Sequence, residues 1–149
     1  MATLIQSSIQ SWRFWALLSA AFAALTAILA KVGVAGVPSD VATLVRTVVI
    51  LALTAAIVVV TGQAADLARI PGRSAVFLVL SGLATGASWL CYFRALSLGD
   101  AARVAPIDKL SVVLVALFGA TLLGETLSPL NWLGVALIAA GAVLVAVGA

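Results

Sequence analysis

The residues with the clearest chemical potential are an acid and a base inside an apolar stretch. Asp108 and Lys109 follow Pro106, and the uncharged residues 110–124 separate them from Glu125. A charge inside a membrane helix costs at least about 2.5 kcal/mol, so it usually faces a partner or a water-filled cavity. Two interpretations remain open: the pair lines a cavity, or its members neutralise each other and only orient the helix.

Other charged and aromatic side chains fall at the same predicted membrane depth. The charges are Lys31, Asp40, Arg46, Arg94 and Asp100. Because ionisable groups within membrane segments tend to gather around one polar pathway, we expect a shared cavity here. Our candidates for lining or gating it are Lys31, Arg46, Trp89, Tyr92, Arg94, Asp108 and Lys109, with the two aromatic residues as walls.

The composition requires a membrane to surround these residues. Of 149 residues, 64% are hydrophobic and 9% charged, far fewer charges than a soluble domain carries. Several apolar runs reach the length of a transmembrane helix, and the short alternating segments of a β-barrel are absent. We therefore expect an all-α polytopic membrane protein in contact with lipid. The net charge of +3 gives no basic patch suited to nucleic acid.

Five spanning helices are predicted in one domain covering residues 1–149. Their approximate ranges are 13–34, 40–61, 74–98, 104–124 and 129–147. Pro38 separates the first two helices, and a polar loop over residues 62–73 follows the second. Pro106 is placed in the first turn of the fourth helix, where its missing N–H costs little.

The last predicted turn has its own capping signals. Ser128 and Pro129 are suited to the N-cap and first position of the fifth helix. Glu125 is expected in the loop before it, with a structural role. Its carboxylate would accept hydrogen bonds from backbone N–H groups near the start of that helix, where the helix dipole favours a negative charge.

Small residues mark two helix faces for close packing. Gly82 and Gly86 form a GxxxG pattern, and Gly134 and Gly141 are one heptad apart. Such residues let helix backbones approach closely in lipid. Contacts within one chain and contacts between two copies are both consistent with these patterns.

Neither a metal site nor an enzyme active site is expected. The sequence has no histidine, and Cys91 is its one cysteine. Since no nucleophile, base and metal set converges anywhere, we predict neither a cofactor nor catalysis.

The orientation of the chain in the membrane is weakly specified: loop cations favour a cytoplasmic N-terminus, but cations near helix ends remove that bias. Insertion in both orientations is therefore open.

Several segments resemble EamA domains of the drug/metabolite transporter superfamily. The segments are Leu123-Gly124-Glu125-Thr126-Leu127-Ser128, then Asn131-Trp132-Leu133-Gly134, and Tyr92-Phe93-Arg94-Ala95-Leu96 through Pro106. Members of that superfamily usually carry two five-helix halves in inverted orientation, whereas this sequence has one. It therefore resembles the single-domain, five-helix bacterial and archaeal branch.

The glycine spacing carries a second, narrower resemblance. The pattern Gly134-x-x-Leu137-Ile138-x-x-Gly141 is similar to the last helix of small multidrug resistance proteins, which makes their dimer contact. Those proteins also carry a coupling glutamate in their first helix. Nothing here matches that glutamate, because Arg13 and Lys31 are the charges near the first helix.

The superfamily resemblance implies a secondary transporter of small metabolites in the bacterial or archaeal cytoplasmic membrane. An antiparallel homodimer would rebuild the two-half architecture and work by alternating access. Excess cations in the cavity favour an anionic or zwitterionic solute, unless ion pairs such as Arg46 to Asp108 cancel them. The alternatives are a non-transporting membrane subunit and a half-transporter that pairs with a different chain.

Overall fold

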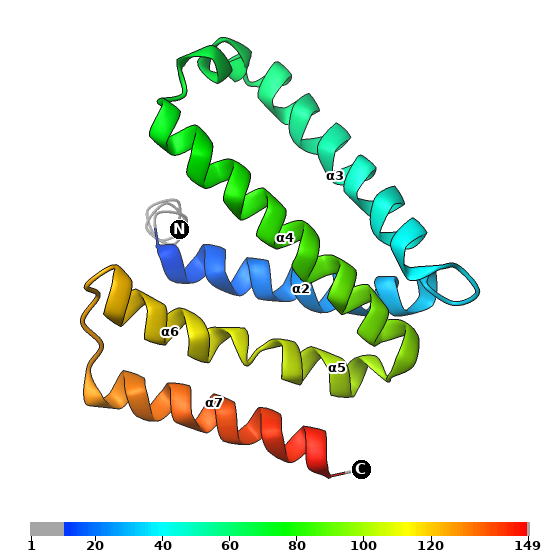
Figure 1. The fold of residues 1–149 in the computed structure, drawn as a ribbon, viewed down its shortest axis with the longest axis vertical. Coiled ribbons are helices and arrows are strands. Elements are labelled where there is room, and N and C mark those ends of the chain that lie inside the picture. The colour runs from blue at the N-terminus through cyan, green and yellow to red at the C-terminus, as the bar shows by residue number, and fades with distance from the viewer. Residues whose placement is uncertain (1–10, 149) are drawn as a thin grey trace, which may run out of the picture.

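The fold is all helical throughout residues 11–148, the part of the chain that the computed structural model describes (Figure 1). The elements are α2 (Trp12–Gly33), α3 (Ser39–Val60), the 3₁₀ helix η1 (Gln63–Arg69), α4 (Gly72–Leu98), α5 (Ala101–Asp108), α6 (Ser111–Leu122) and α7 (Pro129–Val147). Within the described residues, five spans are long and apolar enough to cross a membrane, and α5 with α6 makes the fourth. The polytopic all-α prediction is confirmed.

Helix boundaries agree with the predicted ranges to within two residues for four spans. The exception is the span expected over residues 104–124. It starts earlier, at Ala101, and consists of two helices separated at Lys109–Leu110. The loop predicted over residues 62–73 also differs, because it contains η1, in which Arg69 and Asp66 form an exposed ion pair of 3.3 Å.

The spans form two groups (Figure 1). Helices α3 and α4 make a hairpin that is steeply inclined to α2, α5, α6 and α7 in the view shown. Helix α4 connects the groups, since it contacts α2, α3 and α5, while α7 packs along α5 and α6. Every charged or aromatic candidate residue lies on α2, α3, α4 or the α5–α6 span.

The buried core is small and lies where α2 crosses α4. Ala30 and Val34 meet Phe93 and Leu96, the last of which is fully buried. Most other large apolar side chains are exposed, as expected for residues that face lipid rather than protein. The core fixes α2 against the second half of α4, which carries the aromatic candidates.

The predicted packing glycines make no close contacts within the described chain. A Cβ atom built on Gly82, Gly86, Gly134 or Gly141 would meet no heavy atom within 4 Å outside its own helix neighbourhood. These glycines therefore do not serve close helix approach within residues 11–148. Their faces remain available for contacts with another chain.

The turn after α6 differs from the prediction for Glu125. Gly124 adopts the left-handed conformation (φ 70°), and the backbone N–H groups of Leu123 and Glu125 both donate to the Gly119 carbonyl. The Glu125 carboxylate points back at α6, because a Cβ on Gly119 would lie 2.7 Å from its Oε2. Among the described residues, it accepts no hydrogen bond from the start of α7.

The Ser128–Pro129 helix start is present. The Ser128 hydroxyl oxygen accepts a hydrogen bond from the Asn131 amide at 3.2 Å, and Pro129 is the first residue of α7. The hydroxyl thus occupies the capping position that the Glu125 carboxylate was expected to share. Glu125 has turned toward α6 instead.

Candidate functional site

The break between α5 and α6 is the first component of the candidate site. Pro106 lies inside α5 rather than in its first turn, so no N–H is available there for the Ala102 carbonyl. After it, Lys109 N–H is shared between the Ala105 and Pro106 carbonyls at 3.2 and 3.1 Å. Irregular backbone at membrane depth is tolerated where it faces protein or water, so this break marks a polar region.

Asp108 and Lys109 stand at this break as an ion pair. Lys109 Nζ lies 3.2 Å from Asp108 Oδ2. Each residue also lines its own pocket beside Tyr92: Asp108 borders one of about 270 Å³ and Lys109 one of about 490 Å³. The two sequence interpretations therefore coexist, because the charges are paired and still face open space.

Arg46 forms the second component, on the opposite side of α4. Its guanidinium carbon lies 3.1 Å from the centroid of the Trp89 ring and 5.9 Å from that of Phe93. Trp89 packs edge-on against Tyr92, with ring centroids 5.4 Å apart. One turn of α4 thus places aromatic rings between Arg46 and the Asp108 pocket.

These groups occupy one layer of the bundle. Arg46 lies seven residues after the start of α3, Asp108 seven after the start of α5, and Trp89 nine before the end of α4. At 1.5 Å per residue these separations are roughly 10–14 Å along each helix. Because the three helix ends lie at the same side of the bundle, the layer is well inside the apolar thickness.

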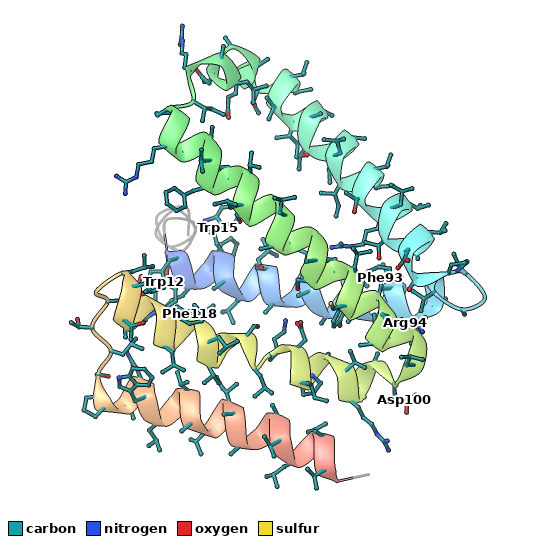
Figure 2. The ribbon with its side chains drawn as sticks, viewed as in Figure 1. Trp12, Trp15, Phe93, Arg94, Asp100 and Phe118 are labelled. Atoms are coloured by element: carbon teal, nitrogen blue, oxygen red, sulfur yellow. The ribbon has the colours of Figure 1, made fainter. Side chains whose placement is uncertain are left out.

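The remaining predicted site residues lie elsewhere. Lys31 Nζ donates to the carbonyl oxygens of Leu96 and Gly99, each at 2.8 Å, so it caps the end of α4. Arg94 is exposed and lines a separate pocket of about 350 Å³ with Asp40 (Figure 2 labels Arg94). The ion pair between Arg46 and Asp108, which the sequence left open as an alternative, is not formed.

Phe93 and Ser88 complete the site and were not predicted. Phe93 borders the Arg46 pocket, and Ser88 borders the Asp108 pocket. The sequence could have predicted Phe93, because it follows Trp89 by four residues and so lies on the same face of the helix. Within residues 11–148, no three side chains gather in a way that could hold a metal ion.

These features define a multi-pass α-helical membrane protein with a polar layer at a broken helix. The model of the EamA-like transporter family matches residues 10–147, and this chain belongs to that family. It is a membrane transporter.

A curated relative and the solved structures complete the comparison. The chain is similar to a Sinorhizobium protein named "Uncharacterized transporter in cobO 3'region", with 72% identity over 138 residues, 93% of this chain and 98% of that protein. No solved structure matches.

Proposed function

We propose that this chain is a secondary transporter of small metabolites in the cytoplasmic membrane, working by alternating access as an antiparallel homodimer. The observation that carries the proposal is the broken α5–α6 span with Asp108 and Lys109 beside Tyr92. Discontinuous helices near mid-membrane are a recurrent feature of secondary transporters. The site would be formed jointly by two copies.

The incompleteness of the walls supports a second copy. Within the described residues, each pocket is bounded by only two or three helices, and a Cβ atom on Gly82, Gly86, Gly134 or Gly141 would meet no atom of another helix within 4 Å. Two inverted halves around a shared site are a common transporter architecture. The Sinorhizobium relative, similar over 98% of its length, supports the use of single five-helix chains.

Cysteine accessibility tests the antiparallel arrangement. In a Cys91→Ser background, single cysteines replace Ala65 in η1 and Gly148 after α7, and an impermeant maleimide is applied to either membrane face. We expect each site to be labelled in part from both faces, because antiparallel pairing requires both orientations. As a control, the same variants are labelled in inverted membrane vesicles, in which the opposite membrane face is exposed to the maleimide.

Labelling of each site from one face only would contradict the antiparallel homodimer. The chain would then act as a parallel dimer, as half of a pair with a different chain, or as a non-transporting subunit. Solute flux in liposomes containing this chain alone separates the first of these from the other two.

A further inference from the structure

The Arg46 guanidinium is a charge without a counter-ion inside the bundle. In the described part of the chain, it makes no hydrogen bond and no ion pair, and its contacts are with the Trp89 and Phe93 rings. A cation at this depth is costly unless something neutralises it. Stacking on an aromatic face offsets part of that cost but supplies no acceptor for the N–H groups.

The neighbouring carboxylates are engaged elsewhere. Asp108 is paired with Lys109 at 3.2 Å, across the aromatic residues of α4. Asp40 contacts the Ser39 hydroxyl at 3.3 Å and borders the pocket of Arg94. Asp100 is exposed in the turn between α4 and α5 (Figure 2). The missing acceptor for Arg46 must therefore come from outside the described chain.

The pocket beside Arg46 indicates what that acceptor is attached to. It has a volume of about 440 Å³, and its walls are the side chains Thr26, Leu29, Ala30, Val37, Ala42, Val45 and Phe93 with Gly33. Apart from Arg46 and Thr26, no lining side chain is polar. Pockets of 300–1,000 Å³ hold small organic ligands. An inorganic anion would leave this apolar volume unused, and a cation would be repelled by Arg46.

We propose that this pocket binds the transported solute, and that the solute is an amphiphilic monocarboxylate. Its carboxylate would pair with the free edge of the Arg46 guanidinium, which Trp89 holds by stacking, and its hydrocarbon part would fill the space between α2 and α3. A planar guanidinium offers two parallel N–H donors to one carboxylate while its face stays stacked. That the solute is transported rests on the proposed function, whereas its binding in this pocket does not depend on that function.

Equilibrium binding to the full chain in lipid nanodiscs tests the site. The probes are benzoate, phenylacetate, 4-phenylbutyrate and octanoate, each compared with its neutral amide. We expect at least one carboxylate to bind tenfold more tightly than its amide. Arg46→Gln should abolish this preference, Arg46→Lys should keep part of it, and Arg103→Gln, an exposed cation of α5 that borders no described pocket, should change it less than twofold.

A second variant separates loss of the site from loss of folding. Gly33 lines the pocket and a Cβ atom on it meets nothing within 4 Å, so Gly33→Leu should occupy part of the pocket while leaving the charge in place. It should weaken binding of the tightest-binding carboxylate at least fivefold and leave the thermal unfolding midpoint unchanged. Equal binding of carboxylates and amides, or a preference that survives Arg46→Gln, would overturn the inference.

Liposome flux distinguishes failure of this inference from failure of the proposed function. Carboxylate binding that depends on Arg46, without any flux of the bound probe, keeps the site and refutes transport by this chain alone. If Arg46→Gln leaves the flux of a probe unchanged, transport is supported and the proposed site is refuted.

Discussion

At the scale of single residues, Lys31 shows why a partly buried charge is not by itself evidence of a solute cavity. Its ammonium group lies on the last carbonyls of α4, where backbone acceptors lack helical partners and the helix dipole is negative. In the sequence, Lys31 has the same predicted membrane depth and the same charge as Arg46. Its contacts in the structure, however, are with backbone carbonyls at the end of α4. We therefore assign Lys31 to helix packing and Arg46 to the site.

Replacing Lys31 with methionine should destabilise the fold. Hydrogen bonds to charged groups contribute about 1.5–3 kcal/mol each. Because both bonds share one ammonium group, we expect less than their sum, a fall in the free energy of unfolding of about 2–4 kcal/mol. Reversible unfolding in mixed micelles with sodium dodecyl sulfate measures the change. Arg103→Met is the matched control, expected within about 0.5 kcal/mol of the parent. Similar values for the two variants would refute the capping role.

At the scale of elements, the broken α5–α6 span is the part of the fold that differs most from the prediction. Proline favours the first turn of a helix, so Pro106 predicts a helix start near residue 104. The chain instead enters α5 at Ala101, directly after the Gly99–Asp100 turn. Pro106 then falls inside the helix and precedes the 3₁₀-like hydrogen bonds at Lys109 and Leu110.

Hydrogen–deuterium exchange should detect this break. In the parent chain, amides of residues 107–113 are expected to exchange faster than those of α7, because i→i+3 bonds in the break have poorer geometry than α-helical bonds. Pro106→Ala restores a donor for the Ala102 carbonyl and should slow exchange in that segment at least threefold, with α7 unchanged as the internal reference. Equal exchange in the parent and variant segments would show that proline does not cause the break.

At the scale of the whole molecule, the sequence predicted the spans well and their contacts poorly. Apolar run length and turn residues such as Ser128–Pro129 determine where a membrane helix begins and ends. They do not determine how α3 and α4 are rotated about their axes. Arg46 meets Trp89 and forms no ion pair with Asp108, a relation that depends on packing between helices distant in sequence.

Larger side chains at the α7 glycines should test association between copies. In one chain, a Cβ atom on Gly134 or Gly141 meets no atom of another helix within 4 Å. Gly134→Leu and Gly141→Leu should therefore change the folding of the single chain little. If α7 contacts a second copy, each substitution should lower the dimer fraction in native lipid particles at least threefold. Gly72→Leu, at the start of α4 and equally free of neighbours, is the control. Unchanged dimer fractions in both α7 variants would place the contact elsewhere.

The turn of α4 that carries Trp89, Tyr92 and Phe93 separates Arg46 from Asp108. Arg46 and Asp108 therefore border different pockets on two sides of one helix. Residues that share no partner and lie apart tend to have independent mutational effects. If the solute occupies the pocket beside Arg46, as proposed, substitutions around Gly33 and Ala42 will alter which compounds are accepted while the broken span keeps its geometry. Divergence in solute preference among relatives of this chain is then expected to accumulate on the α2–α3 side of α4.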